Sequence, residues 1–135
     1  MFTHTLTVRF RDLDALNHVN NSVYLTYLEE TRIAYMAARQ VGGLTNPEQG
    51  TILAHCEIDY RRPALLADTL RIELGIGSIR HSSFEFTYRV IRQADEQLIA
   101  QAMTVQVCYN YRLGTPIRIP GDLLQLLQAD QHIVC

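Results

Sequence analysis

The chain has 135 residues, of which 47% are hydrophobic and 19% are charged. This is the composition of an ordinary globular protein, and it excludes long disordered regions, fibrous repeats and a multidomain layout, so we predict a single domain over residues 1–135. The formal net charge of -2 also excludes a dedicated nucleic-acid binder, because such a protein normally carries a basic excess.

The cysteines and the first residues bear on the compartment. Cys56, Cys108 and Cys135 are too few for a disulfide framework and show no C-x-x-C spacing, so we interpret them as reduced thiols of a cytoplasmic protein. The N-terminus lacks the charged and apolar regions of a secretion signal. No window approaches the roughly 18 continuous apolar residues of a membrane helix, and we expect no membrane span.

The first half of the chain predicts one strand and one long helix. Residues 2–10 alternate between apolar and polar side chains, and the threonines among them favour a strand. A polar loop follows over residues 11–20. Aromatic and aliphatic residues then recur at three- and four-residue spacings from about residue 22 to residue 40, which predicts a helix with one broad buried face.

The expected ends of this helix carry residues typical of helix boundaries. Asn20 or Asn21 is the expected N-cap, because a short polar side chain there accepts a hydrogen bond from a free amide of the first turn. Gly42 and Gly43 are expected to stop the helix, since glycine accepts a left-handed backbone conformation.

After a turn-rich linker over residues 43–50, the side chains alternate with a period of two. Four long strands are predicted, near residues 52–60, 70–77, 84–90 and 99–109. In the first, one face is expected to carry Ile52, Ala54, Cys56, Ile58 and Tyr60. In the last, one face is expected to carry Ile99, Met103, Val105, Val107 and Tyr109. A short final helix is predicted over residues 123–127, begun at Gly121 and Asp122.

These elements predict an α+β fold in which a five-stranded, curved antiparallel sheet wraps around one long central helix. The helix, roughly 28 Å long at 1.5 Å per residue, is the only element long enough to cover the apolar face of the sheet. Because one helix cannot cover five strands and both sheet edges, we expect the protein to self-associate.

The polar loop is where chemistry is expected, and Asp12 and Asp14 are its two carboxylates. One interpretation is structural: one aspartate closes a turn and the other pairs with Arg9 or Arg11. The other interpretation places a carboxylate near the first turn of the helix, where unpaired backbone amides form an oxyanion site.

The second interpretation suits acyl transfer. A carbonyl oxygen held at the helix N-terminus is polarised, and a carboxylate opposite can attack the carbonyl carbon or deprotonate a water that does so. A thioester is especially suitable because its thiolate is a good leaving group, so no serine or histidine nucleophile is needed.

A metal site is the competing hypothesis, since Asp12, Asp14 and His18 have D-x-D-x-x-x-H spacing. No second cluster of ligands supports it, and we predict no metal and no cofactor. We interpret His18 as a residue that orders the loop. Neither His55 nor His81 has a nearby serine or cysteine at nucleophile-elbow spacing.

Residues 8–32, which read V-R-F-R-D-L-D-A-L-N-H-V-N-N-S-V-Y-L-T-Y-L-E-E-T-R, resemble the signature of hotdog-fold acyl-CoA thioesterases of the hydroxybenzoyl-CoA thioesterase-like family. Residues 60–70 resemble the strand-turn-strand step of that family. The resemblance implies that Asp14 is the catalytic carboxylate and that the backbone amide at about Asn21 holds the thioester oxygen. It also implies a homodimer or homotetramer with acyl-CoA sites at subunit boundaries.

One position departs from the family. Asn17 stands where the related proteins usually have glycine, and asparagine tolerates a left-handed backbone better than most residues, so we expect the turn to survive.

Further residues are assigned to substrate binding. Because coenzyme A carries several phosphate charges and the protein is acidic, specific arginines must bind it. The candidate arginines are Arg61, Arg62 and Arg80, and Ser82 and Ser83 are candidates to donate to a phosphate or to pantetheine. Tyr24 is a candidate to line the acyl pocket, and His18 and Asn20 are further candidates for substrate binding. For the arginines the alternative is a solvated strand end, and for Tyr24 it is the core.

The predicted function is hydrolysis of an acyl-CoA thioester to free acid and coenzyme A. Two rivals remain open. One is a hotdog protein that binds acyl-CoA without hydrolysing it, as a sensor or carrier. The other is a hotdog dehydratase or hydratase, for which Asp14 and His18 are the only candidate pair.

Overall fold

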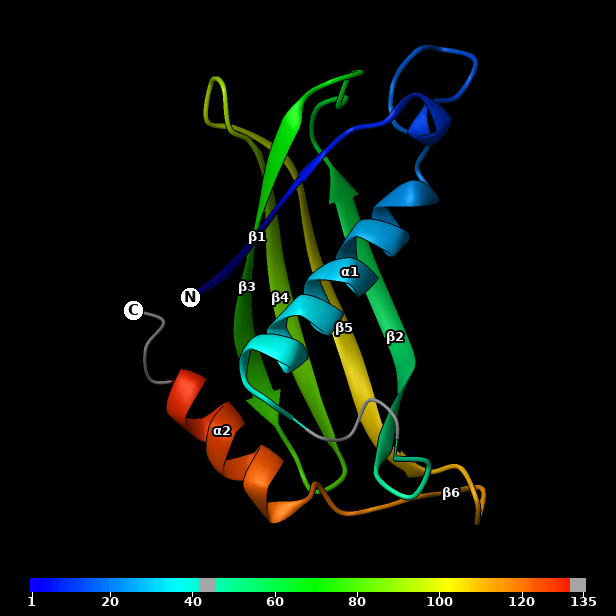
Figure 1. Cartoon of the computed structure of the whole chain (residues 1–135), viewed down its shortest axis with the longest axis vertical. Coiled ribbons are helices and arrows are strands. Elements are labelled where there is room, and N and C mark those ends of the chain that lie inside the picture. Colours follow the sequence, from blue (N-terminus) through cyan, green and yellow to red (C-terminus); the bar gives the residue numbers. More distant parts are fainter. Residues whose placement is uncertain (42–45, 132–135) are drawn as a thin grey trace.

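Six strands form a single antiparallel sheet, and a long helix crosses one of its faces (Figure 1). The computed structural model describes residues 1–41 and 46–131. The strands lie in the order β1-β3-β4-β5-β2, and the short β6 pairs with β5. Their bounds are β1 (Phe2–Thr7), β2 (Gly50–Tyr60), β3 (Thr69–Ile79), β4 (Ser83–Arg92), β5 (Gln97–Asn110) and β6 (Thr115–Pro116). The predicted α+β class is confirmed.

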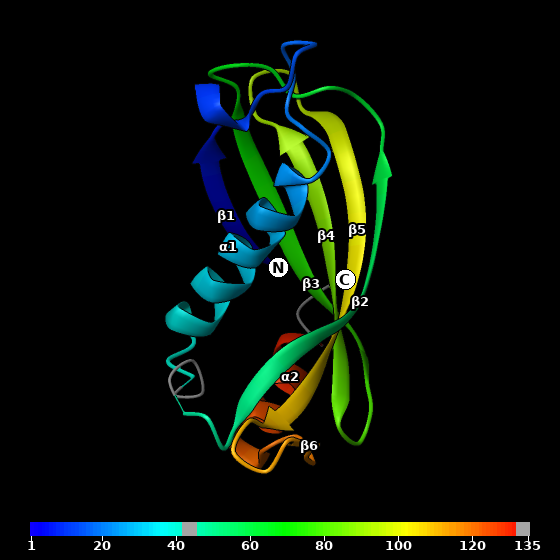
Figure 2. The same ribbon diagram turned by 90° about the vertical axis from the view of Figure 1, so that its right-hand side faces the viewer.

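The sheet curves around α1 (Val23–Ala38), as Figure 2 shows from the side. One stripe of this helix is buried, because residues three, four and seven apart share a helix face; it consists of Tyr24, Tyr27, Leu28, Thr31 and Tyr35. They meet the inward side chains of β3 and β4, among them Phe86 and Tyr88. The predicted core, one helix packed in a curved sheet, is confirmed.

A second helix, α2 (Gly121–Gln131), packs against the end of β3 that lies near the last turn of α1 (Figure 1). Leu127 is fully buried there. The Asp130 carboxylate accepts hydrogen bonds from the Tyr35 hydroxyl at 2.5 Å and from Arg39 Nε at 2.9 Å. The short final helix was predicted, although it extends to Gln131 rather than to Leu127.

The first strand is shorter than predicted. It ends at Thr7 instead of residue 10, and Phe10–Asp12 form a short 3-10 helix, η1. The reason is a local turn: the Asp12 amide donates to the Arg9 carbonyl, and the Arg9 amide donates to Asp12 Oδ2. Phe10, which the alternation placed with the apolar face of the strand, is 80% exposed.

The ends of α1 also differ from the prediction. Ser22, rather than Asn20 or Asn21, is the N-cap residue, and its side chain makes no capping bond. Asn20 Oδ1 accepts from the Ser22 amide in the turn before the helix. At the other end, Gln40 takes a left-handed conformation with φ of 57°, and the Val41 amide donates to the Met36 carbonyl. Gly42 and Gly43 lie outside the described residues.

The inward faces of β2 and β5 were predicted in part incorrectly. On β5 the inward side chains are Thr104, Gln106 and Cys108, whereas Met103, Val105, Val107 and Tyr109 lie on the outer face. On β2 a register shift between Leu53 and His55 reverses the alternation, so that Cys56 and Ile58 face inward and Ile52 faces outward.

The rest of the chain adds two findings. Strand β6 was not predicted, because two residues are too short to show a periodic pattern. Within residues 1–41 and 46–131, neither helix has the length and apolar character needed to cross a membrane.

Candidate active site

The turn that carries Asp14 is a small hairpin held by backbone bonds. Leu13 and Val19 form an antiparallel bridge, the Asp14 amide donates to the His18 carbonyl, and the Asn17 amide donates to the Asp14 carbonyl. Asn17 has a φ of 65°, which confirms that asparagine supports the left-handed turn expected at this position. These backbone bonds fix the position of Asp14 at the start of the turn.

The hairpin packs against the connection between β2 and β3. His18 forms a bridge with Leu65, and the Val19 amide donates to the Ala64 carbonyl at 2.9 Å. That connection is itself held by Arg92, which donates to the Asp68 carboxylate and to the Pro63 carbonyl. These contacts place the hairpin at the end of the sheet where α1 begins.

Asp12 is buried, and its Oδ2 is bonded to two protein donors. Its side chain accepts hydrogen bonds from the Tyr27 hydroxyl at 2.7 Å and from the Arg9 amide at 3.0 Å. Burial alone would raise the pKa of Asp12, but these two donors outweigh it and hold the pKa below its ordinary value. Burial and the Asp12 carboxylate together raise the pKa of Tyr27 far above its ordinary value. Asp12 is therefore a structural carboxylate.

Asp14 has different surroundings, although it is only two residues away. Its side chain is 29% exposed, and Oδ1 accepts a hydrogen bond from the Leu16 amide at 2.9 Å. The same oxygen lies 3.8 Å from Nδ1 of His18. Oδ2 accepts no hydrogen bond from the residues that the structure describes. This leaves one carboxylate oxygen free to act on a ligand.

The start of α1 presents an unused donor beside this turn. The Ser22 amide donates to Asn20 Oδ1, and the Val23 amide donates to the Asn20 carbonyl. Within the described chain, the exposed Asn21 amide donates to no protein acceptor. Free amides at a helix N-terminus lie at its positive end and are suited to bind an oxyanion.

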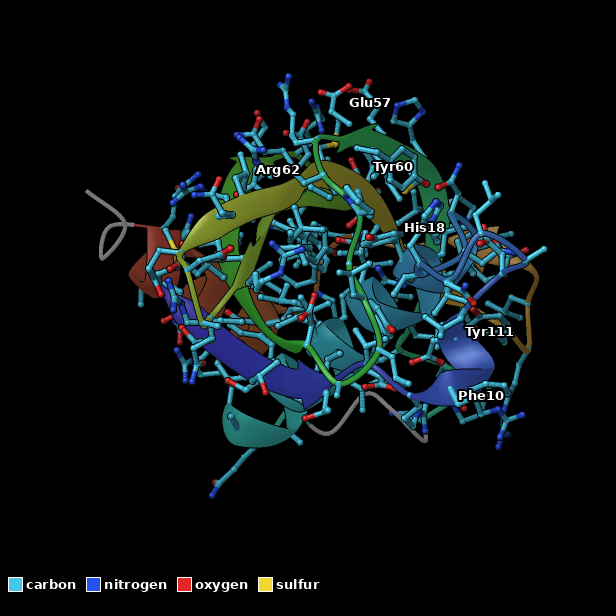
Figure 3. The ribbon with its side chains drawn as sticks, turned by 90° about the horizontal axis from the view of Figure 1, so that it is seen from above. Phe10, His18, Glu57, Tyr60, Arg62 and Tyr111 are labelled. Atoms are coloured by element: carbon cyan, nitrogen blue, oxygen red, sulfur yellow. The ribbon has the colours of Figure 1, made fainter. Side chains whose placement is uncertain are left out.

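A hollow of about 290 Å³ opens beside the start of α1. Its lining combines the hairpin, the start of the helix and the end of β2: His18, Val19, Asn21, Tyr60, Arg61, Arg62 and Pro63. Figure 3, seen from above, shows His18, Tyr60 and Arg62 on the same side of the molecule. Four predicted site residues therefore meet here, and Asp14 adjoins the hollow through His18 without lining it.

Next to this hollow lies a second one, of about 340 Å³, between α1 and β2. The two hollows share Asn21 and Tyr60, and the second adds Leu25, Cys56 and Ile58. Burial raises the pKa of the Cys56 thiol, which keeps it protonated and makes it unsuitable as a nucleophile at neutral pH. A mostly apolar groove thus continues from the start of α1 along β2.

Of the remaining predicted residues, Asn20 accepts from the Ser22 amide beside the hollow without lining it, and the other four do not gather at this site within one copy of the chain. Tyr24 is buried, and its ring packs edge-on against Tyr27 and Tyr60. Burial raises the pKa of Tyr24 to about 12, so it belongs to the core. The other three, Arg80, Ser82 and Ser83, lie where β3 turns into β4, at the opposite end of the sheet from the start of α1 (Figure 1).

Side-chain geometry also bears on the metal alternative. The carboxylates of Asp12 and Asp14 do not share a site, because the first is bound to Tyr27 in the interior and the second faces His18. Among residues 1–41 and 46–131 there is no group of three or more histidine, cysteine or acidic side chains arranged to hold a metal ion.

Sequence reasoning missed Tyr60 as a site residue. Its hydroxyl donates to the Asn21 carbonyl at 3.1 Å, and its ring packs against Tyr24, so it links the end of β2 to the start of α1. The alternation of β2 assigned Tyr60 to the core, whereas it is 46% exposed. Its place at the strand end, beside Arg61, was the available signal.

Comparison with known proteins identifies the family. The model of the thioesterase-like superfamily matches residues 8–127. The 1,4-dihydroxy-2-naphthoyl-CoA hydrolase of Nostoc punctiforme is 29% identical, with 97% of this chain and 89% of that protein covered. The long-chain acyl-CoA thioesterase FadM of Escherichia coli is 27% identical, with 91% of this chain and 94% of that protein covered.

A solved structure agrees on the fold. The 1,4-dihydroxy-2-naphthoyl-CoA thioesterase of Synechocystis superposes with a TM-score of 0.87 at 22% identity, covering 94% of this chain and 95% of that one. The predictions of a hotdog fold and of a thioester-hydrolysing enzyme are thereby confirmed. The chain belongs to the thioesterase-like superfamily.

Proposed function

We propose that the protein hydrolyses acyl-CoA thioesters at the start of α1, with Asp14 as the catalytic carboxylate and the Asn21 amide as the oxyanion donor. The observation that carries this proposal is that residues 14–21 hold, among the described residues, both a carboxylate with an unbonded oxygen and a helix-terminal amide without a protein acceptor. The amide lines a hollow together with His18, which lies beside Asp14. The relatives named as CoA hydrolases and thioesterases support the reaction class.

The proposed reaction follows from these two groups. The Asn21 amide binds the thioester carbonyl oxygen and stabilises the negative charge that develops on it. Asp14 then acts in one of two ways. It removes a proton from a water that adds to the carbonyl carbon, or it adds directly and forms an anhydride that water opens. In both cases the carbon–sulfur bond breaks, and the products are the free acid and coenzyme A.

The proposed substrate contacts use the residues that line the hollow. The Arg62 guanidinium forms no ion pair within the described residues and is proposed to bind a phosphate of coenzyme A. Arg61 lies beside it, where it donates to Gln101 Oε1 at 3.3 Å. The groove between α1 and β2 is proposed to take the acyl group. No metal or redox cofactor is needed in this proposal.

We also propose that the working enzyme is a homodimer or homotetramer. Leu25 and Ile33 on α1, and Leu53 on β2, are between 44% and 48% exposed in one copy. These side chains lie along the same side of α1 and β2 as the groove, so a second copy packed there would cover them together with the bound acyl group. Because Arg80, Ser82 and Ser83 lie at the far end of the sheet, they would act on this substrate only from a second copy. Light scattering during gel filtration measures the oligomeric state. A cytoplasmic location stays a prediction.

The decisive experiment replaces Asp14 with asparagine and measures thiol release with a colour reagent. Short, long, branched and aromatic acyl-CoAs are compared. Asp14→Asn should keep the fold and lower the turnover number by at least roughly a hundredfold, the usual scale for losing a positioned base. Circular dichroism confirms folding, and Asp59→Asn, on the outer face of β2, is the matched control.

Two results would contradict the proposal. Wild-type turnover in a folded Asp14→Asn variant would remove Asp14 from the reaction. Saturable acyl-CoA binding without thiol release from any acyl-CoA would favour the non-catalytic sensor or carrier.

A further inference from the structure

Four polar side chains form a connected cluster beneath α1, away from Asp14. Arg32 Nη1 donates to the Tyr88 hydroxyl at 3.3 Å, and that hydroxyl lies 2.6 Å from Thr104 Oγ1. Gln106 Nε2 donates to the same Thr104 oxygen at 2.5 Å. Tyr88, Thr104 and Gln106 are each at most 3% exposed. The proposed reaction uses none of these groups.

Gln106 is the incomplete member of this cluster. Its Oε1 is buried and accepts no hydrogen bond from any residue that the structure describes. A buried acceptor without a donor is costly, because it has lost its bonds to water and gained none in return. The position is unusual as well, since the neighbouring inward residues of β4 are Phe84 and Phe86. A glutamine here calls for a donor that residues 1–41 and 46–131 of one copy do not supply.

A cavity of about 310 Å³ adjoins Gln106. Met36 and Phe86 give it apolar walls, while Glu29, Arg32 and Gln106 give it polar groups. The cavity lies between α1 and the strands β2 and β5, so it continues the side of α1 that borders the two hollows at the start of the helix.

The distance between the proposed reaction centre at Asn21 and the polar cluster at Arg32 limits which acyl groups can reach that cluster. Asn21 and Arg32 are eleven residues apart, which is about 16 Å along a helix at 1.5 Å per residue. Leu25, Cys56 and Ile58 line the stretch between them. An acyl chain whose carbonyl sits at Asn21 would therefore cross an apolar stretch before it meets a polar end. A single aromatic ring on the thioester carbon would not reach that far.

We propose that the cavity beside Gln106 forms the far end of the groove between α1 and β2. This end selects acyl groups that carry a hydrogen-bond donor, such as a terminal hydroxyl, far from the thioester. This inference rests on the proposed function for the position of the thioester. The hydroxyl donates to Gln106 Oε1, and Arg32 lies beside it as a donor to the hydroxyl oxygen. An unsubstituted chain that fills the same space leaves the glutamine oxygen unpaired, and sites of this kind reject analogues that lack the bonding group.

The test compares matched substrate pairs. Values of kcat/KM are measured for ω-hydroxydodecanoyl-CoA against dodecanoyl-CoA, and for ω-hydroxyhexadecanoyl-CoA against hexadecanoyl-CoA. The wild-type enzyme should prefer the hydroxylated member of at least one pair by about tenfold or more. Gln106→Met, which keeps a long side chain without the oxygen, should bring the ratio close to one by raising activity on the unsubstituted chain.

Controls separate selectivity from folding. Gln93→Met changes an exposed glutamine outside the groove and should keep the wild-type ratio. Gln106→Leu serves as the second variant if Gln106→Met does not fold. Equal kcat/KM for both members of each pair in the wild type would overturn the inference, and so would a preference that survives both Gln106 variants.

A binding measurement distinguishes this failure from failure of the proposed function. If the wild-type enzyme releases no thiol from any acyl-CoA, hydrolysis is wrong, and calorimetry with free ω-hydroxyhexadecanoate and hexadecanoate then decides the selectivity. Tighter binding of the hydroxy acid that is lost in Gln106→Met would support the groove. Equal binding of the two acids would overturn it.

Discussion

Asp12 and Asp14 stand two residues apart on one turn, and their carboxylates have opposite surroundings. The Asp12 carboxylate lies in the interior and accepts from Tyr27 and Arg9. The Asp14 carboxylate is partly exposed, and among the described residues only the Leu16 amide donates to it. A buried carboxylate that accepts from a buried hydroxyl stabilises the fold, whereas a partly exposed carboxylate with an unbonded oxygen can act on a ligand. Residue type and spacing do not separate these roles, but hydrogen-bond partners do.

The largest expected effect is a difference in the free energy of unfolding between variants of Asp12 and Asp14. Asp12→Ala removes the acceptor for the buried Tyr27 hydroxyl and should lower the free energy of unfolding by about 3 kcal/mol. Asp14→Ala should lower it by no more than about 1 kcal/mol, because it breaks one exposed bond. Urea unfolding followed by circular dichroism measures both. Equal losses in the two variants would mean that Asp14 also has an architectural role.

The second prediction concerns the donor that pairs with Asp14. The Val23 amide bonds to the Asn20 carbonyl, so Asn21 occupies the second position of a four-residue turn, where proline is well tolerated. Asn21→Pro removes the amide hydrogen and should lower kcat by about a hundredfold, as expected when one oxyanion donor is lost.

Asn21→Ala is the matched control for this prediction, because it keeps the amide and should keep most of the activity. Thiol release and urea unfolding are measured on both variants. Full activity in a folded Asn21→Pro variant would remove the amide from the mechanism. A large loss in Asn21→Ala would instead assign the role to the side chain.

The fold was largely predictable because periodic patterns are local. The period of two gave all five long strands, and the three- and four-residue spacing gave α1. The errors arose where one residue changes the pattern. A single extra residue near Ala54 reverses the faces of β2. Gln40 follows the end of α1 in a left-handed backbone conformation, which non-glycine residues adopt infrequently and which its residue type therefore does not predict.

The candidate site was less predictable, because its members come from distant parts of the chain. The spacing placed Asp14 and Asn21 on one loop, but the contact between Asn21 and Tyr60 joins residues 39 positions apart. No role was predicted for Gln106, because the alternation of Met103, Val105 and Val107 suggested that these apolar residues face the core. Only pairing with β4 shows that the glutamine lies inward.

The third prediction concerns how the stability contributed by the Asp12 carboxylate depends on pH. The pKa of Asp12 is lower in the folded protein than its ordinary value of 3.8. A carboxyl group of this kind contributes its stability above the ordinary pKa, and the contribution is lost as the pH falls through the lower, folded-state pKa. The excess stability of wild type over Asp12→Asn should therefore be full near neutral pH and shrink in acid.

Urea midpoints of wild type, Asp12→Asn and Asp14→Asn at neutral and acid pH measure this effect. Other carboxyl groups also titrate in acid, and the difference between wild type and Asp12→Asn cancels their contribution. An excess of wild type over Asp12→Asn that does not change with pH would show that the charge on Asp12 is not what stabilises the turn.

The smallest expected effect concerns the backbone that holds Asp14. Asn17 has a φ of 65°, a conformation that glycine adopts at no steric cost, so Asn17→Gly should change the free energy of unfolding by no more than about 1 kcal/mol and leave kcat unchanged. Asn17→Val is the contrasting variant, because a branched side chain resists this conformation. Since the Asn17 amide bonds to the Asp14 carbonyl, Asn17→Val should lower both stability and turnover. Normal turnover in a destabilised Asn17→Val variant would show that Asp14 does not depend on this turn for its position.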